Sequence, residues 1–465
     1  MEQRLQDRRG ATHHPQQRRR DGTRPRACRK HGKPGPHIGR MNTRSHLPEA
    51  ADAVVVGGGI IGCSTAYYLA RAGLDVVVCE KGWIGCEQSS RNWGLIRKQG
   101  RHPAEIPLMI RSLELWHDLV GQIDRDIGFR VNGTLYLSET EERYEANRKW
   151  MEHARDFGLD TRMLGTGDLE ALAPGIRNQK RDALFTPSDA SAEPHLATRA
   201  IADLAIASGG RILEHCAVRG IDLEAGRVAG VATEHGRIRT GAVVCAGGAW
   251  SGYFCHHLGI RLPQLKVASS VMLTRPTDFI LKPALWSGGL GLRRRPDGSY
   301  IAAFAGTADC PVTPDFLRYA WSYLPIYRQS KEIVRVRLGR RFFTELGWPS
   351  GRSDGRRTPY ETERVLDPAP NADLLGRARK RLGQTFPDLA DIRISRTWAG
   401  MIDTMPDELP VIDEPSAVPG LVISTGYSGH GFGIGPGAGR ATADLVLGKA
   451  DSSALIGGLS FGRLA

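Results

Sequence analysis

The chain has 465 residues, of which 41% are apolar and 24% are charged, and its formal net charge is +13. This size and composition are ordinary for a soluble globular protein of about two to four domains. Residues 1–44 hold thirteen Lys or Arg against three acidic residues, so the rest of the chain carries only about +3. A body that is basic throughout is therefore excluded.

The N-terminal segment 1–50 is predicted to be a disordered basic tail, because it has too few apolar residues to bury a core. It also lacks the apolar stretch of a secretory signal. Three interpretations are open: a disordered appendage, an arm for nucleic acid or a membrane surface, and translated sequence upstream of a true start at Met41. The last is favoured because Met41 stands just before the first predicted strand.

The eight cysteines show no CxxC pair and no metal-ligand spacing. A reduced, cytoplasmic protein without a metal site is therefore expected. The uncharged run 53–70 is long enough to suggest a membrane span, but three consecutive glycines starting at Gly57 argue against one, so no transmembrane segment is expected.

Residues 52–80 predict a buried parallel strand, a glycine-rich turn, a helix and a second strand. The turn is a GxGxxG motif. Its glycines allow a tight turn, close approach of a pyrophosphate and close packing of the helix, whose N-terminus favours anions. An acidic residue ends the second strand and can accept hydrogen bonds from an adenosine ribose. The predicted contacts of this dinucleotide-binding unit are Gly57, Gly59, Ile60, Ile61, Gly62 and Glu80.

A polar, glycine-bearing loop follows the second strand, where an NAD-binding fold would normally enter another helix. Its hydroxyl and amide groups suit a ribityl chain and a diphosphate, so the loop favours FAD over NAD. The loop residues predicted to contact the cofactor are Lys81, Ser89, Ser90, Arg91, Asn92 and Gly94.

Two later strands also run into glycine-rich turns. The first covers residues 240–246, and the second covers 419–424 and leads through a turn into a helix predicted from about Gly439 to Leu447. The cofactor contacts predicted from this part of the chain are Val218, Gly247, Gly248, Trp250, Gly429, His430, Gly431, Phe432 and Gly433.

Together with Asp189–Pro194 and the segment from Trp398 to Asp407, these motifs resemble the D-amino-acid oxidase superfamily, especially its sarcosine oxidase and glycine oxidase branch. The resemblance implies an α/β fold with a Rossmann-like FAD-binding domain and a discontinuous α+β substrate domain on a mixed, largely antiparallel sheet. It places the FAD-binding domain in 51–128, 186–256 and 396–450, the substrate domain in 129–185 and 257–395, and a C-terminal tail in 451–465.

The resemblance also implies a reaction, the oxidation of the C–N bond of an amine or of a D-, N-substituted or secondary amino acid. The product is an imine, and a hydride passes to the flavin N5. The expected partners are this small-molecule substrate and an electron acceptor, which is oxygen, a quinone or a partner protein. Because a neutral amine in good alignment is sufficient, no dedicated general base is required. The turn 426–435 could direct backbone N–H groups at the flavin edge that becomes negative.

Arg97, Arg293 and His430 are the candidate catalytic residues. The resemblance places Arg97 at the carboxylate-binding arginine, with a surface arginine as the alternative, and Arg293 where oxidases have a lysine that promotes reaction with oxygen. Gly433 stands where sarcosine oxidase has a substrate-binding lysine, so oxidase and dehydrogenase both stay open. Gly400 stands at the flavin-linking cysteine, which predicts non-covalent FAD. His430 is included as a polar site residue without an acid–base role.

Two alternatives are kept: an NAD-dependent dehydrogenase, against which the loop and the C-terminal turn argue, and a flavoprotein associated with nucleic acid through the tail. Residues 320–345 have an amphipathic pattern with several arginines on polar positions. They are interpreted as a solvated helix face, with a docking surface for an acidic partner as the other possibility.

Overall fold

The computed structural model describes residues 47–177, 182–304, 307–329, 334–352 and 355–464. Predictions about the tail before residue 47, including a start at Met41, concern residues outside this part of the chain. The described residues belong to one compact unit, Thr43–Ala465. Among the described helices, none has the length and apolarity that a membrane crossing requires.

A six-stranded sheet forms the first layer of the described structure. Its strands are parallel except for β21 at one edge, and the central ones are short, continuously apolar runs, as expected for strands covered on both faces. All six come from the three segments predicted to build the FAD-binding domain. In sheet order they are β21 (Val411–Asp413), β22 (Leu421–Thr425), β13 (Ala242–Cys245), β1 (Ala53–Val56), β2 (Val76–Glu80) and β9 (Arg211–Glu214).

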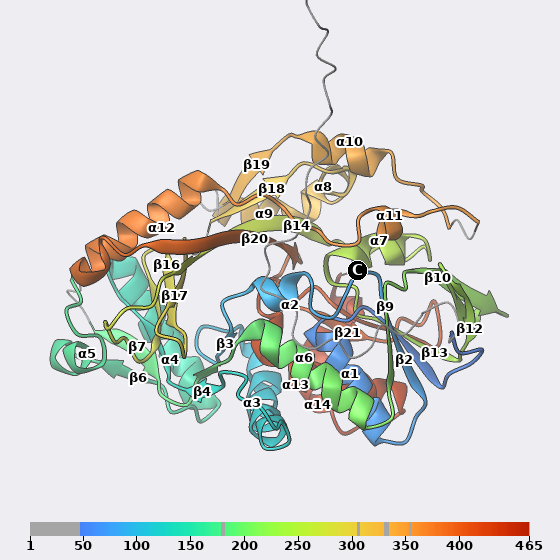
Figure 1. Cartoon of the computed structure of the whole chain (residues 1–465), viewed down its shortest axis with the longest axis horizontal. Coiled ribbons are helices and arrows are strands. Elements are labelled where there is room, and N and C mark those ends of the chain that lie inside the picture. The colour runs from blue at the N-terminus through green and yellow to red at the C-terminus, as the bar shows by residue number, and fades with distance from the viewer. Residues whose placement is uncertain (1–46, 178–181, 305–306, 330–333, 353–354, 465) are drawn as a thin grey trace, which may run out of the picture. The chain divides into compact units, whose positions relative to one another are not determined.

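Helices pack together beside this sheet. One of them, α13, packs against both α1 and α3, and α6 packs against α1 (Figure 1). The helices of this layer are α1 (Ile60–Arg71), α3 (Ile106–Val120), α6 (Pro194–Ala207), α13 (Gly431–Val446) and α14 (Ser453–Ile456).

Helix α13 begins at Gly431, so the prediction of a start near Gly439 was wrong. The segment between these positions is rich in glycine and contains a proline, which sequence propensity counts against a helix. Packing between α1 and α3 overrides that propensity. Ser112 of α3 completes the helix at the proline: its hydroxyl accepts from the Gly437 amide at 3.0 Å and donates to the Gly433 carbonyl at 2.9 Å.

A ten-stranded, largely antiparallel sheet forms the second layer, and its long strands β14 and β20 run side by side across the molecule (Figure 1). Its strands come mainly from the segments predicted for the substrate domain. In sheet order they are β19 (Val334–Arg337), β18 (Ala308–Pro311), β14 (Leu265–Thr274), β17 (Tyr300–Phe304), β16 (Leu290–Arg294), β15 (Ala284–Ser287), β5 (Thr134–Tyr136), β7 (Ala183–Thr186) and β6 (Arg162–Leu164), with β20 (Ile394–Thr404) paired to β14. The exact division into domain segments stays a prediction.

Smaller elements complete the described fold. Two further sheets contain β3 (Leu95–Ile96), β8 (Ala190–Ser191) and β4 (Arg130–Val131), and β10 (Val218–Glu224), β11 (Arg227–Thr233) and β12 (Gly236–Arg239). The remaining helices are α2 (Gln88–Arg91), α4 (Glu141–Asp156), α5 (Thr166–Leu172), α7 (Ser251–His256), α8 (Pro314–Arg318), α9 (Ala320–Gln329), α10 (Arg340–Leu346), α11 (Pro359–Thr362) and α12 (Ala372–Thr385).

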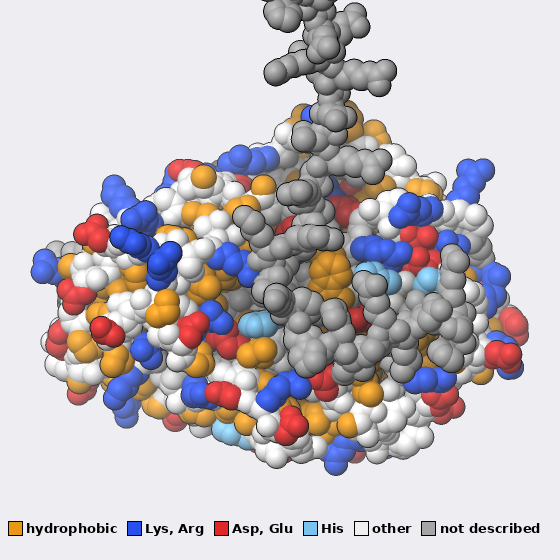
Figure 2. Space-filling view, viewed as in Figure 1, with side chains coloured by type: hydrophobic (Ala, Val, Ile, Leu, Met, Phe, Trp, Pro, Cys, Tyr) orange, Lys and Arg blue, Asp and Glu red, His pale blue; other side chains and the backbone are white. Residues whose placement is uncertain are grey.

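The interpretation of residues 320–345 as one helix face was wrong. Helix α9 ends at Gln329, strand β19 follows at Val334–Arg337, and α10 begins at Arg340. Residues 334–337 pair with β18 and extend the ten-stranded sheet, and a continuous helix through them would lose this pairing. Figure 2 shows basic and acidic side chains interspersed over the described surface of one face, in agreement with the nearly neutral charge of the body.

Candidate active site

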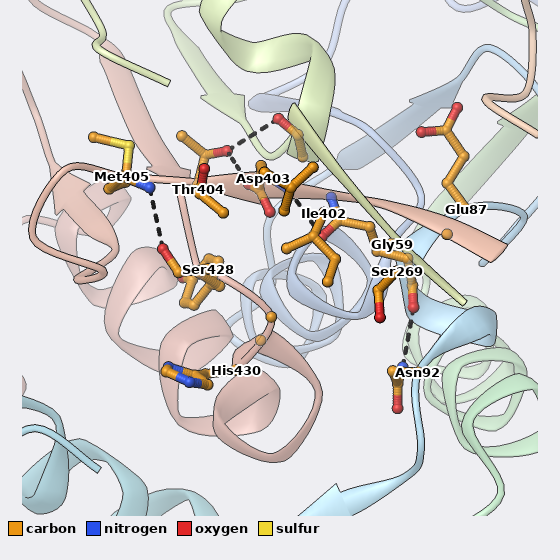
Figure 3. Close-up of a pocket in the computed structure, with 18 of the residues that line it drawn as sticks. Gly59, Glu87, Asn92, Ser269, Ile402, Asp403, Thr404, Met405, Ser428 and His430 are labelled. Carbon is orange, nitrogen blue, oxygen red and sulfur yellow. Dashed lines mark hydrogen bonds between the residues drawn. The ribbon is translucent and has the colours of Figure 1, made fainter. Parts of the chain in front are cut away.

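A cavity of about 1060 Å³ lies between the two main sheets. Its walls come from the ends of β1, β2 and β13, from β14 and β20, and from the starts of α1 and α13. Figure 3 shows Ile402 and Ser269 between Asn92 on one side and Ser428 and His430 on the other. The predicted site residues that line the cavity are Gly57, Gly59, Ile60, Ile61, Glu80, Lys81, Ser89, Arg91, Asn92, Arg97, Val218, Gly247, Gly248, Trp250, Gly429, His430, Gly431 and Phe432.

Five predicted site residues are not in this lining: Gly62, Ser90, Gly94, Arg293 and Gly433. All three glycines among them lie against backbone. A Cβ on Gly62 would collide with the Gly57 carbonyl, and one on Gly94, where φ is +80°, would collide with the Ala192 carbonyl. A Cβ on Gly433 would lie 2.9 Å from both Ile96 Cα and the Leu95 carbonyl oxygen. These glycines allow the elements around the cavity to approach closely.

The first strand–turn–helix unit has the geometry of an anion site. Gly57 has φ +110°, and a Cβ there would collide with the Ala246 carbonyl, so the turn requires glycine. The N-cap of α1 is Gly59, which makes no side-chain capping bond, and no acidic side chain stands in the first turn. The Ile60 amide donates to Ser89 Oγ at 2.9 Å. The N-terminal dipole of α1 thus faces the cavity without a carboxylate cap.

Glu80 closes the turn at the end of β2. Its carboxylate accepts from the Gly58 amide at 2.7 Å and from the Gly82 amide at 2.6 Å. Burial raises the pKa of the Glu80 carboxyl, although Lys81 and the two amides act in the opposite direction. The side chain is therefore held in place at the cavity wall, where a ribose would require an acceptor.

Lys81 forms a charged cluster with Glu87, a residue that sequence reasoning missed. Lys81 Nζ lies 2.7 Å from Glu87 Oε1 and 4.5 Å from the centre of the Trp250 ring. Trp250 Nε1 donates to the same Glu87 oxygen at 3.2 Å. Only the position of Glu87 inside the polar loop could have suggested its role.

The loop after β2 is tied to β20. Arg91 Nη1 donates to Asp367 Oδ1 at 2.6 Å and to the Ala399 carbonyl at 2.9 Å. Trp398 Nε1 donates to the Arg91 carbonyl at 3.0 Å. Gly400 follows on the same strand, and a Cβ there would lie 3.1 Å from Arg91 Cβ. The position assigned to a flavin-linking cysteine is therefore crowded by the loop.

The turn before α13 is folded around Asp403, which sequence reasoning also missed. Asp403 Oδ2 accepts from the Gly426 amide at 2.9 Å, and the Asp403 carbonyl accepts from the Ser428 amide at 3.0 Å. Gly426, Ser428 and Gly429 all have positive φ, so the chain turns sharply there. Burial raises the pKa of Asp403 to about 6, although the Gly426 amide lowers it. The N-cap of α13, His430, makes no side-chain capping bond.

Arg101, Glu105 and His430 connect α13 with the segment after β3. Arg101 Nη1 lies 3.2 Å from Glu105 Oε1, and Arg101 Nη2 donates to the His430 carbonyl at 3.0 Å. His430 Nδ1 lies 3.6 Å from Glu105 Oε2. Burial alone would raise the pKa of Glu105, but Arg101, His430 and Arg97 lower it to about 2. The His430 backbone is thus bonded to Arg101, and its ring lies beside the Arg101–Glu105 ion pair.

Arg97 is buried, with 8% of its surface exposed, so the alternative of a surface arginine was wrong. Its Nη1 donates to the Gln99 carbonyl, and its Cζ lies 5.9 Å from the centre of the Tyr136 ring. Within the described ranges, no carboxylate lies at ion-pair distance from Arg97, whereas the neighbouring Arg101 is paired. A buried guanidinium on a cavity wall that has no ion-pair partner among the described residues favours an anionic ligand.

Arg293 has a different environment. It is almost fully buried, its Nη2 lies 3.0 Å from Glu193 Oε1, and Arg295 Nε shares the same carboxylate at 2.9 Å. Burial lowers the pKa of Arg293, and Glu193 opposes this. Because its guanidinium lies behind Gly94 and not on the cavity wall, this geometry gives Arg293 no direct contact with a ligand.

Comparisons with known proteins place the chain among flavin-dependent enzymes. A family model described as FAD dependent oxidoreductase matches residues 52–445. The L-amino acid deaminase from Proteus vulgaris superposes with a TM-score of 0.83 and 31% identity, covering 87% of this chain and 95% of that one. Glycine oxidase from Pseudomonas aeruginosa is 26% identical over 407 residues, covering 85% of this chain and 94% of the relative.

A third relative matches over a shorter region. The mitochondrial sarcosine dehydrogenase of Mus musculus is 27% identical over 242 residues, which are 50% of this chain. The match covers 26% of that protein, so the chain spans about a quarter of the length of this relative.

Proposed function

The chain belongs to the FAD dependent oxidoreductase family, and on this basis we propose that it oxidises the C–N bond of a carboxylate-bearing amino acid to an imine. Membership confirms the predicted superfamily, the α/β fold and FAD as the cofactor, so the NAD alternative is dropped. The relatives reported above, which act on amino acids by their names, support the activity. The nucleic-acid alternative depends on the tail, outside the described residues.

The residues present fit FAD. The N-termini of α1 and α13 have no side-chain caps, and both line the same cavity. This arrangement suits a long ligand with a phosphate group at one helix start and an electron-rich ring at the other. The α1 turn and Glu80 would hold the pyrophosphate and the adenosine ribose of FAD, and residues 429–432 would lie at the flavin end. When bound, FAD supplies the two-electron oxidant. We retain non-covalent binding as a prediction, supported by the crowding at Gly400.

The substrate proposal depends on the burial of Arg97 on the cavity wall. A substrate carboxylate would give this buried guanidinium the direct ion-pair partner that it lacks among the described residues. Its planar fork matches a carboxylate with two parallel hydrogen bonds, which fixes the orientation of the substrate as well as its affinity. D-, N-substituted and secondary amino acids all carry this group.

The α13 start would complete the site. The first backbone N–H groups of a 16-residue helix and its positive dipole end face the cavity at Gly431 and Phe432. They would stabilise negative charge developing there without a charged side chain. The His430 carbonyl accepts from Arg101 and its ring lies beside the Arg101–Glu105 ion pair, so we assign His430 a positioning role.

The test compares Arg97→Met and Arg97→Lys with wild-type enzyme, using an amino acid and the amine that lacks its carboxylate. Loss of a buried charge partner costs about 2–5 kcal/mol, so kcat/KM for the amino acid should fall roughly 30-fold or more in Arg97→Met. The amine should change little, and Arg97→Lys should lie between. Flavin content should stay equal to that of wild type. Arg111→Met, at an exposed ion-paired arginine of α3, is the control.

An equal loss for the amino acid and the amine would contradict the proposal, because it would show that Arg97 supports the site without recognising the carboxylate. Unchanged kinetics would contradict it as well.

We further propose that the electron acceptor is not oxygen. The resemblance assigns an oxygen-activating cation to the position of Arg293, and that side chain lies off the cavity wall and is ion-paired with Glu193. Turnover with a quinone or an artificial acceptor should exceed turnover with oxygen. Peroxide production at the full rate of substrate oxidation would refute this.

A further inference from the structure

We propose that the cavity contains a subsite for an aromatic amino-acid side chain, built by Trp93, Tyr136 and Trp286. This inference rests on the proposed function and names the substrate class for the same site. All three rings line the cavity, and they come from segments far apart in the sequence: the loop before β3, strand β5 and strand β15.

The three rings form a continuous row. The ring centres of Trp93 and Trp286 are 5.5 Å apart, and those of Trp286 and Tyr136 are 5.8 Å apart. Arg97 Cζ lies 5.9 Å from the centre of the Tyr136 ring, so the guanidinium stands at one end of the row. A substrate whose carboxylate binds Arg97 would therefore have its side chain directed along an aromatic wall.

The row is a wall and not a cage. Neighbouring rings meet at 42° and 34°, with centre distances typical of direct ring contact. A cage for a methylated ammonium group needs rings that face one another across a gap, and rings in mutual contact leave no such gap. A wall of tilted, contacting rings fits a flat apolar group, such as a phenyl or indole ring, which can pack against one of their faces.

Two glycines hold the wall in position. A Cβ on Gly291 of β16 would collide with the six-membered part of the Trp93 indole, so this ring lies directly on the strand. A Cβ on Gly100 would lie 2.7 Å from Tyr136 Cε2. Because the backbone supports the rings closely, their faces are preorganised, and binding an aromatic group would require little ordering.

The preference should be measurable against a small side chain. In phenylalanine one methylene separates the ring from the carbon that bears the amine, so carboxylate and ring can contact Arg97 and the wall together. A single methylene in an apolar pocket changes discrimination about 10-fold or more, so a whole ring should favour phenylalanine over alanine by at least that factor.

The experiment uses holoenzyme and measures kcat/KM for phenylalanine and alanine, each as both enantiomers, with glycine and sarcosine beside them. Calorimetry measures binding of 3-phenylpropionate and propionate. These have the carbon skeletons of phenylalanine and alanine but lack the amine, so the enzyme cannot oxidise them to imines. The variants are Trp286→Leu and Trp286→Phe. Trp83→Leu is the matched control, since Trp83 is 39% exposed and lies outside the cavity lining.

We expect wild-type enzyme to favour phenylalanine over alanine and 3-phenylpropionate over propionate, and Trp286→Leu to lose about 10-fold of that preference. Trp286→Phe should keep part of it, and Trp83→Leu all of it. If Trp286→Leu does not fold, Trp286→Phe and the wild-type ratios decide.

Equal or faster turnover of alanine, glycine or sarcosine would overturn the aromatic subsite and leave the proposed function intact. An unchanged phenylalanine preference in folded Trp286→Leu would also overturn it. Preferential binding of 3-phenylpropionate without oxidation of any amino acid would support the subsite and refute the proposed function instead.

Discussion

Replacement of Gly433 by alanine tests the packing that sets the position of Arg97. Gly433 lies in the first turn of α13, and a Cβ there would be 2.9 Å from Ile96 Cα, 2.9 Å from the Leu95 carbonyl oxygen and 3.4 Å from the Arg97 amide. All three atoms are backbone of β3 or of the residue after it, so no side chain can rotate away. Either α13 or the strand that leads to Arg97 has to move.

Two opposing effects determine how much Gly433→Ala changes the free energy of unfolding. Alanine in a helix is favoured over glycine by about 1 kcal/mol, whereas overpacking a closely packed contact costs typically 1–3 kcal/mol. The net expectation for Gly433→Ala is destabilisation by roughly 0–2 kcal/mol, together with a raised KM for amino acids, since Arg97 is displaced.

Urea unfolding followed by flavin fluorescence measures the first quantity, and steady-state kinetics measure the second. Gly376→Ala is the control, because Gly376 lies within helix α12 and a Cβ there meets nothing within 4 Å. That variant should be stabilised by about 0.5–1 kcal/mol. If Gly433→Ala were as stable as Gly376→Ala with an unchanged KM, the contact between α13 and β3 would not have the role assigned to it.

Two further predictions concern buried carboxylates, and a third concerns the glycine turn before α1. In Glu105→Gln the buried Arg101 loses its charge partner. Because the pKa of Glu105 is lowered to about 2 in the folded protein, the ionised Glu105 contributes its full stabilisation above the unfolded-state pKa of 4.5. Urea unfolding at pH 7 should therefore show a free energy of unfolding about 3 kcal/mol lower than that of wild type. The pKa of Asp403 is raised to about 6 in the folded protein, so folding binds a proton and wild type becomes more stable as the pH falls. Relative to Asp403→Asn, the free energy of unfolding of wild type should rise by about 2 kcal/mol between pH 7 and pH 4.5. A difference between the two proteins that does not change with pH would contradict this. Gly57→Ala should lose FAD, as judged by the flavin-to-protein absorbance ratio; Gly209→Ala, with a similar positive φ but open space around it, should keep FAD.

The first dinucleotide-binding unit could be predicted from sequence because its signals are local. A continuously apolar strand, three spaced glycines and an acidic residue at the next strand end determine β1, α1 and β2, and Glu80 lies where expected at the end of β2. The early start of α13 could not be predicted, since glycines and a proline oppose a helix locally. Ser112 and the close packing with α1 and α3, which stabilise it, are contacts distant in sequence.

The substrate side of the cavity was less predictable. Arg97 was assigned by resemblance, and only the structure shows that it is buried and without a carboxylate partner among the described residues. Glu87 and Asp403 bind backbone or side-chain groups through contacts that no sequence motif indicates. The aromatic wall depends on three rings from separate segments that approach one another only when the ten-stranded sheet forms.

The most direct test of the proposed activity is anaerobic mixing of the purified holoenzyme with amino acids while the absorption band of oxidised flavin is recorded. We predict that an amino acid bleaches the flavin in wild-type enzyme, and that Arg97→Met, still fully loaded with flavin, needs a far higher concentration of the same amino acid. A flavin that no amino acid reduces, or one reduced equally well with and without Arg97, would contradict the proposal that this cavity oxidises a carboxylate-anchored substrate.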